Sequence, residues 1–381
     1  MSTEAKAMGI PMGEPWFKIK DWARGAGVVA RSSNYELIGS MSSRVMEIIG
    51  RHCAAQEIYS VDESFVQLRG TVDELTALGH KIRADVLRST GIPVRVSIGK
   101  SKTLAKLANR GAKEDLSLGG VCHLGSYSAE HTNRIMEGTH VTALWGVAGR
   151  TGKRLAAMNI HTVRDLRDAD PKWIRKKISV VMERTVHELR GIPCIPLEQQ
   201  REYKDQLIFS RSFSRPVQTV EDMRQVLSIY AQKVSSRLRA QGQVAGVVSS
   251  WAATSWHCPG ESHSPHVAVG IPTATDDPIG LGKAAFALLP RIRHGTPYVR
   301  AGVVLTGLRP KGSATPLSLF EPEFEGRRVG ETLDAITSKL GPRAIGVGLG
   351  GLQGAPVWNM KREMLSRRAT THWDELCEAI A

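Results

Sequence analysis

Apolar and polar residues alternate along the first third of the chain with two distinct periods. Helical spacing of three to four residues gives way to short stretches rich in β-branched and aromatic residues, which favour strands. The predicted elements are, in order, a helix over 35–49, strands over 58–61 and 65–68, a helix over 73–89, a strand over 94–98 and a helix over 101–109. This β-β-α-β-α order is most of the split β-α-β pattern of a ferredoxin-like sheet, with its opening β-α piece absent.

The rest of the chain divides into a helical segment and a mixed one. From residue 141 a helix, a glycine-rich turn and a second helix predict a separate helical domain. After Pro193 and Pro196 the pattern predicts strands over 206–213, 245–253, 266–271 and 298–307 and helices over 220–240 and 280–289. The Gly/Pro/Arg-rich tail has one predicted helix over 330–340 and another at the C-terminus. The fold class is therefore α+β with several domains.

Charge and composition narrow the class of protein. The chain has 381 residues, enough for two or three domains, and carries 51 Lys and Arg against 37 Asp and Glu, a net charge of +14. With 41% hydrophobic residues it is a folded chain whose excess charge favours a polyanion, first of all nucleic acid, over a basic protein without such a partner. Five dispersed cysteines, no apolar run of membrane length and no signal peptide predict a soluble, cytoplasmic protein.

Two adjacent acids, Asp62 and Glu63, fall at the junction of the first two predicted strands. Neighbouring side chains on a strand point to opposite faces, so both can reach one metal ion only where a turn breaks the pleat. Mg²⁺ is commonly held by one or two carboxylates together with substrate phosphates. The pair therefore suits a nucleoside triphosphate site, with a solvated acidic turn as the alternative.

Basic residues gather around the start of the next predicted helix. Free N–H groups and the helix dipole favour phosphate there. The basic residues are Lys100, Lys102, Lys106, Arg110 and Lys113. Carboxylates for metal ions opposite lysines for phosphate oxygens would make a phosphoryl-transfer site. A solvated basic helix is the alternative.

A glycine-rich turn between two predicted helices offers a second phosphate site. Its glycines Gly146, Gly149 and Gly152 allow backbone N–H groups to face DNA phosphates, and Arg150 and Lys153 add charge. A tight helical turn is the alternative. The G-x-G-x-x-G match over 346–351 is predicted to be a loop, because no strand precedes it.

Several motifs, in this order, resemble the Y-family translesion DNA polymerases of the UmuC type. They are SSNYELIGSMSSRVMEII, EIYSVDESFVQLRG, VSIGKSKTLAKLANRGAK, LWGVAGRTGKRLAAMNIHTVRDL, ERTVHELRGIPC and FSRSF, with VWNMKREMLSRRATTHWDEL near the end. The resemblance implies an α+β polymerase fold of the right-hand type, in which a ferredoxin-like sheet forms the palm. The implied domains are partial fingers (1–36), palm (37–125), thumb with a helix-hairpin-helix (126–198), little finger (203–310) and a clamp-binding, UmuC-type tail (311–381).

The resemblance also implies roles for single residues. Asp62 would hold the catalytic metal ions and Glu63 would help at the primer end. Lys113 would contact the incoming triphosphate. The nucleotide pocket would be lined by Ser33, Asn34 and Tyr35. DNA contacts would come from Lys102, Lys106 and the glycine turn. A sliding-clamp peptide would include Leu317, Leu319 and Phe320, with Pro316 where the family usually has Gln.

The implied activity is error-prone, template-directed and Mg²⁺-dependent DNA synthesis during the SOS response to DNA damage. The implied partners are damaged primer-template DNA, a deoxynucleoside triphosphate, a UmuD-type dimer, the RecA filament and the sliding clamp. Family members open with a strand bearing Asp-x-Asn-x-Phe-Tyr, whereas this sequence begins at what resembles the middle of the fingers. We therefore expect a start assigned too late, a gene fragment, or a non-catalytic DNA- and partner-binding remnant.

Overall fold

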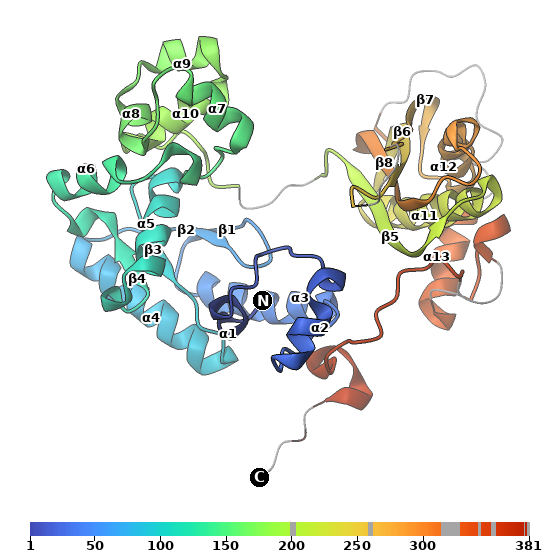
Figure 1. The fold of residues 1–381 in the computed structure, drawn as a ribbon, viewed down its shortest axis with the longest axis horizontal. Coiled ribbons are helices and arrows are strands. Elements are labelled where there is room, and N and C mark those ends of the chain that lie inside the picture. The colour runs from blue at the N-terminus through green and yellow to red at the C-terminus, as the bar shows by residue number, and fades with distance from the viewer. Residues whose placement is uncertain are drawn as a thin grey trace. The chain divides into compact units, whose positions relative to one another are not determined.

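A computed structural model describes residues 1–198, 203–257, 262–313, 328–341, 344–351, 356–376 and 378. The chain forms two compact units (Figure 1). The first comprises Met1–Gln200 with Met364–Ala381, and the second comprises Arg201–Glu363. Within the described ranges, no helix combines the length and the apolar character needed to cross a membrane.

The first unit begins with a series of helices, two of which share a small apolar core. Val45 of one helix meets Ile82 and Val86 of the next, and all three side chains are buried. A capping box between Thr71 and Glu74 starts the later helix. The helices are α1 (Thr3–Ala7), α2 (Trp16–Gly25), α3 (Tyr35–Gly50) and α4 (Val72–Thr90).

The strands of this unit confirm the predicted β-β-α-β-α order. Strands β1 (Ala55–Ile58) and β2 (Ser64–Gln67) pair antiparallel, as expected for a hairpin. The bounds predicted for the first strand, 58–61, were wrong, because the chain already turns after Ile58, where the Tyr59 and Ser60 N–H groups donate to the Glu63 carbonyl. The described residues also contain a parallel pair of strands, β3 (Val96–Ile98) and β4 (Val121–His123). The sequence pattern predicted β3 but not β4. Strand β4 was missed because three residues are too few to set a period. Each pair forms its own two-stranded sheet.

Helix α5 (Lys102–Glu114) joins this region to the helical part of the unit. Ser101 caps it, as predicted, by accepting a hydrogen bond from the Leu104 N–H at 3.2 Å. Leu104 and Leu107 are buried in one continuous core with the helices that follow. Those elements are α6 (Ala129–Glu137), the 3₁₀ turn η3 (Val141–Ala143), α7 (Gly149–Ala156), α8 (Val163–Asp168), α9 (Pro171–Lys177) and α10 (Val180–Leu189).

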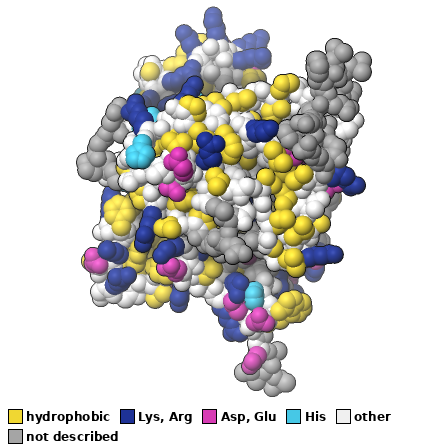
Figure 2. Space-filling model, turned by 90° about the vertical axis from the view of Figure 1, so that its right-hand side faces the viewer, with side chains coloured by type: hydrophobic (Ala, Val, Ile, Leu, Met, Phe, Trp, Pro, Cys, Tyr) yellow, Lys and Arg dark blue, Asp and Glu magenta, His cyan; other side chains and the backbone are white. Residues whose placement is uncertain are grey.

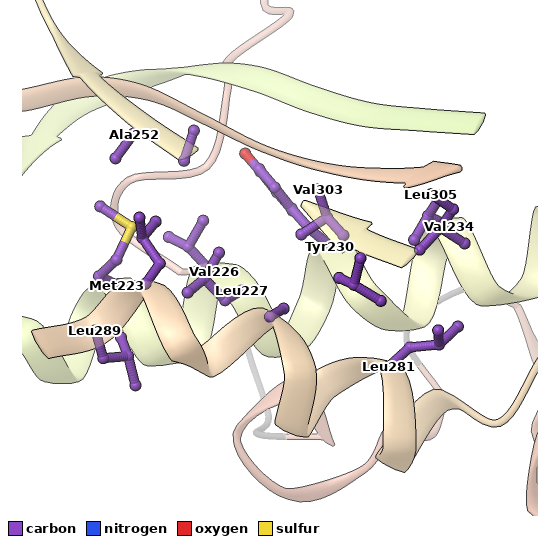
Figure 3. Packing of buried hydrophobic residues seen from close by; sticks show 14 of the residues in the cluster. Met223, Val226, Leu227, Tyr230, Val234, Ala252, Leu281, Leu289, Val303 and Leu305 are labelled. Atoms are coloured by element: carbon purple, nitrogen blue, oxygen red, sulfur yellow. The ribbon is translucent and has the colours of Figure 1, made fainter. Parts of the chain in front are cut away.

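The second unit is a four-stranded antiparallel sheet with helices on one face. Its described strands, β5 (Leu207–Val217), β6 (Gln243–Thr254), β7 (His266–Thr275) and β8 (Tyr298–Pro310), lie in the order β5-β8-β6-β7. Figure 3 shows side chains of helix α11 (Val220–Ala240) beneath the strands, and Leu281 of α12 (Pro278–Ala285) lies on the same side of the sheet, in the same core. Burying each such side chain contributes about 1.5–3 kcal/mol.

The tail contains one regular helix and several short turns. Helix α13 (Val329–Leu340) confirms the helix predicted over 330–340. A tail helix at the C-terminus was also predicted, and this was wrong for the described residues, which form 3₁₀ turns η7 (Ala369–Thr371) and η8 (Trp373–Glu375) instead. The glycine-rich segment over 346–351, predicted to be a loop, ends in a 3₁₀ turn, η6 (Gly348–Gly351).

Candidate active site and nucleic-acid interface

The turn between β1 and β2 carries the two adjacent acids, whose side chains have different partners. The N–H groups of Tyr59 and Ser60 donate to the Glu63 carbonyl at 3.1 and 3.0 Å, which closes the turn. Asp62 is exposed at its tip, and the Ser60 hydroxyl donates to Asp62 Oδ1 at 2.6 Å. Glu63 turns toward α5 instead, where Lys106 Nζ lies 2.6 Å from Glu63 Oε2.

Lys106 sits in a box of aromatic rings beside Glu63. Its Nζ lies 5.0, 5.6 and 5.7 Å from the ring centroids of Tyr59, Phe65 and Trp145, and its side chain is 15% exposed. The indole N–H of Trp145 donates to the Tyr59 hydroxyl at 3.3 Å. Cation–π contacts and the ion pair together fix the position of the ammonium group. Lys106 therefore orients the Glu63 carboxylate.

The start of α5 is engaged by a buried carboxylate. Glu188 is fully buried, and its Oε2 accepts a hydrogen bond from the Thr103 N–H at 2.9 Å. Its Oε1 accepts from the N–H groups of Cys194 and Ile195 at 2.7 and 3.1 Å. Sequence reasoning expected these helix N–H groups to face phosphate. It missed Glu188 because 85 residues separate it from Thr103 and no local pattern marks it.

Lys102 also has partners inside the first unit. Its ammonium group pairs with Glu57, donates to the Pro196 carbonyl at 2.7 Å and lies 5.0 Å from the Phe65 ring centroid. Its side chain is 10% exposed. Lys113, in contrast, is exposed in the last turn of α5. Seven residues from Lys106, it lies about 10 Å along the same face of the helix.

The three residues predicted to line a nucleotide pocket have different surroundings. Ser33 and Tyr35 are exposed. Asn34 is 5% exposed and caps α3 by accepting from the Leu37 N–H at 3.3 Å. Its amide nitrogen donates to Ser366 Oγ of the tail at 3.1 Å. The role of this segment in nucleotide binding stays a prediction.

The glycine turn before α7 has two positions at which the structure favours glycine. Gly146 has a φ of +84°, which favours glycine. A Cβ at Gly152 would overlap Cγ2 of Thr142, so glycine allows this close approach. Arg150 and Lys153 are exposed at the start of α7. The predicted arrangement of basic side chains beside a glycine turn is therefore present.

A second short turn lies beside the first. The Val141 N–H donates to the His161 carbonyl at 2.8 Å. Burial opposes ionisation of Asp165, but hydrogen bonds from the N–H groups of Thr162 and His161 and from the Thr162 hydroxyl outweigh it and lower the pKa of that carboxyl. The ionised Asp165 thus closes the capping box of α8 with Thr162.

Sequence reasoning did not single out the sheet face of the second unit that lies opposite α11 and α12. Exposed residues of this face include Ile208, Ser212, Ala268, Gly270 and Arg300. Arg300 lies over the Trp251 ring at 5.4 Å. A Cβ at Gly302 would come within 2.7 Å of Trp251 Nε1, so glycine lets the indole lie across the strand. Small residues at every second position along β5 (Ser210, Ser212) and β7 (Ala268, Gly270) were the available signal.

Basic side chains are spread over the surface in view in Figure 2, with acidic ones in a few places. Among the described residues, no three His, Cys, Asp or Glu side chains converge to hold a metal ion. The predicted clamp residues Leu317, Leu319 and Phe320 lie outside the described residues.

Comparison with known proteins identifies the family. Residues 1–110 match the impB/mucB/samB family, residues 204–319 match its C-terminal domain and residues 327–379 match a domain of unknown function. Protein UmuC of Salmonella typhimurium is 39% identical over 98% of this chain and 90% of its own length. The chain belongs to the impB/mucB/samB family. It is a UmuC-type member of the Y-family DNA polymerases, as the motifs predicted.

Other members and relatives agree with this assignment. Protein ImpB of Salmonella typhimurium is 37% identical to this chain, and the alignment covers 98% of this chain and 89% of ImpB. DNA polymerase IV of Desulfatibacillum aliphaticivorans is 25% identical over 89% of this chain and 84% of that protein. The solved Y-family DNA polymerase chimera Dbh-Dpo4(243-245)-Dbh has the same fold, with a TM-score of 0.62, 18% identity and coverage of 81% and 86%.

Proposed function

We propose that this chain is the catalytic subunit of an error-prone translesion DNA polymerase that acts in the SOS response to DNA damage. The observation that carries the proposal is the pair Asp62 and Glu63 on the β1–β2 turn, beside the basic face of α5, in a UmuC-type chain. The substrates are damaged primer-template DNA and a deoxynucleoside triphosphate. The primer 3′ hydroxyl oxygen bonds to the α-phosphorus, and pyrophosphate leaves as the proton passes to water.

The turn acids have the donor chemistry that Mg²⁺ prefers, because both offer hard carboxylate oxygens and Asp62 is exposed. Asp62 and Glu63 would hold the ion, together with phosphate oxygens of the substrate. When bound, Mg²⁺ neutralises charge that develops on the phosphates. Lys106 keeps Glu63 in place through its 2.6 Å ion pair, and the exposed Lys113 is free to swing toward the triphosphate.

Several surfaces would bind DNA without reading sequence. Arg150, Lys153 and the N–H groups beside Gly146 and Gly149 would contact phosphates at the helix-hairpin-helix. The sheet face that carries Arg300 would add a second grip. Lys102 and Lys106 were also predicted to bind DNA, and their ion pairs favour a positioning role instead.

The proposed protein partners rest on likeness to UmuC alone. They are a UmuD-type dimer, the RecA filament and the sliding clamp, the last through residues 317–320. Each can be tested by pull-down with the purified partner.

Primer extension by the protein expressed from its own locus tests the proposal. Asp62→Asn removes a proposed metal ligand and should lower extension by at least 100-fold while DNA affinity stays within twofold. Asp73→Asn, which removes the same charge from the first turn of α4, is the matched control and should leave extension unchanged. Extension by D62N at the normal rate would show that the metal assignment is wrong. DNA binding without extension by the unaltered chain would favour the non-catalytic alternative.

A further inference from the structure

The tail matching the domain of unknown function is fixed firmly to the second unit. Trp358 is 6% exposed and lies in the main apolar core, with its ring 5.6 Å from Phe213 and 6.2 Å from Tyr230 between centroids. Its indole N–H donates to Gln225 Oε1 at 3.2 Å. The Ser214 N–H donates to the Trp358 carbonyl at 3.0 Å. Because the indole completes the core, this attachment is part of the fold of the unit.

Helix α13 and turn η6 fasten the same part of the tail to α11. Arg239, whose side chain is 8% exposed, makes two hydrogen bonds to the Asp334 carboxylate at 2.6 and 3.0 Å. The Val347 N–H donates to Gln232 Oε1 at 2.9 Å, and Gln232 Nε2 donates back to the Val347 carbonyl at 3.1 Å. Burial and bidentate geometry make the Arg239–Asp334 pair a strong one.

A few residues further on, the tail attaches to the first unit. The Ser32 N–H donates to the Met364 carbonyl at 2.8 Å, and Ser32 forms a parallel bridge with Leu365. Asn34 Nδ2 donates to Ser366 Oγ at 3.1 Å. The hydroxyls of Ser40 and Thr370 lie 3.1 Å apart. Apart from the buried Asn34, these contacts are hydrogen bonds between partly or fully exposed residues, in contrast to the apolar attachment at Trp358.

The chain between these attachments is short. Seven residue steps separate Trp358 from Leu365, and an extended chain of that length spans at most about 25 Å. This is a second covalent crossing between the units, in addition to the segment after residue 198. The tail segment after Trp358 is held in an apolar core at one end and only by hydrogen bonds at the other. The hydrogen-bonded end can therefore detach and rebind while both units stay folded.

We propose that residues 356–376 form an intramolecular strap, held permanently in the second unit by Trp358 and docked reversibly on residues 32–40 of the first. Docking holds the segment that carries Ser33, Asn34 and Tyr35, because the buried Asn34 side chain finds its amide partners in the tail. Release frees the second unit to move over a longer range. This assigns a role to the domain of unknown function, and the role does not depend on polymerase activity.

A disulfide trap tests the docking. The double variant Ser40→Cys, Thr370→Cys places thiols where two hydroxyls lie 3.1 Å apart, and a protease site inserted after Glu198 allows the chain to be cut between the units. After mild oxidation and cleavage, we expect most of the protein to run as one band without reductant and as two bands with it. The control Ser42→Cys, Thr370→Cys places the first thiol about 200° around α3 and should give two bands in both lanes. Equal trapping of both pairs, or trapping of neither, would overturn the proposal.

Hydrogen exchange tests the difference between the two attachments. The Ser214 amide, which donates to the Trp358 carbonyl, should exchange at least tenfold more slowly than the Ser32 amide, which donates to the Met364 carbonyl. Ending the chain after Glu363 should speed exchange at Ser32 at least tenfold and leave Ser214 unchanged. The control Trp373→Ala alters a tail side chain that is 88% exposed and should change neither rate. Unchanged exchange at Ser32 in the shortened chain would contradict docking there.

Discussion

Replacing the buried Glu188 with glutamine tests how the first unit holds α5 in place. The carboxylate accepts N–H groups at both oxygens, from Thr103 at one and from Cys194 and Ile195 at the other. A glutamine has one acceptor oxygen, so its NH₂ group must face an N–H donor whichever way it turns. The lost charge-assisted bonds and the unsatisfied buried donor cost about 2–4 kcal/mol. With a urea m-value of about 2–3 kcal/mol/M, the midpoint should fall by about 1 M.

Pulse proteolysis in urea measures the unfolding midpoint of the first unit alone when the peptides from α5 and α10 are followed by mass spectrometry. Glu183→Gln is the matched control on the same helix, because Glu183 pairs at 3.2 Å with an Arg175 side chain that is 62% exposed. That pair should contribute less than about 1 kcal/mol. A midpoint for E188Q within 0.2 M of the unaltered protein, or equal to that of E183Q, would refute the account that Glu188 holds the start of α5 in place.

Three further predictions concern the second unit, DNA binding and pH. Trp358→Ala should destabilise the second unit by about 3–5 kcal/mol, measured as a lower urea midpoint for its peptides. Replacing Arg150 and Lys153 with Ala should weaken DNA binding and reduce the slope of log affinity against log salt by up to about 2, measured by fluorescence anisotropy. Arg368, through its side chain and its N–H, lowers the pKa of Glu375 from 4.5 to about 2, so its support of the tail turn should be complete above pH 4.5 and lost as pH falls through 2. An NMR titration of the Glu375 carboxyl with a midpoint near 4.5 would contradict this.

Local patterns predicted the elements that are built from local contacts. The acidic turn between two strands, the Ser101 cap and the long α11 each depend on residues within a few positions of one another, and each is present. The extent of β5 was underestimated, because its last residues follow a register shift opposite β8 that the period of the strand does not reveal.

Contacts between distant residues could not be predicted in this way. Asn34 has the sequence of a helix cap, and it is one, but its amide partners lie 332 residues further along the chain. Lys102 and Lys106 have the spacing of a solvated basic face, whereas Glu57 and Glu63 of the facing hairpin neutralise them. Only the three-dimensional arrangement distinguishes a lysine that is available to bind phosphate from one that pairs with a carboxylate and orients it.

The contact of Trp145 with Tyr59 and Phe65 has a mechanical consequence. It ties the entrance of the glycine turn to the hairpin that carries Asp62, with ring centroids 5.7 and 5.8 Å apart. If a duplex binds at the glycine turn as proposed, a load applied there would reach the acidic turn through rings packed edge-to-face and tilted against one another. Seating of the duplex and alignment of the acids would then occur as a single event.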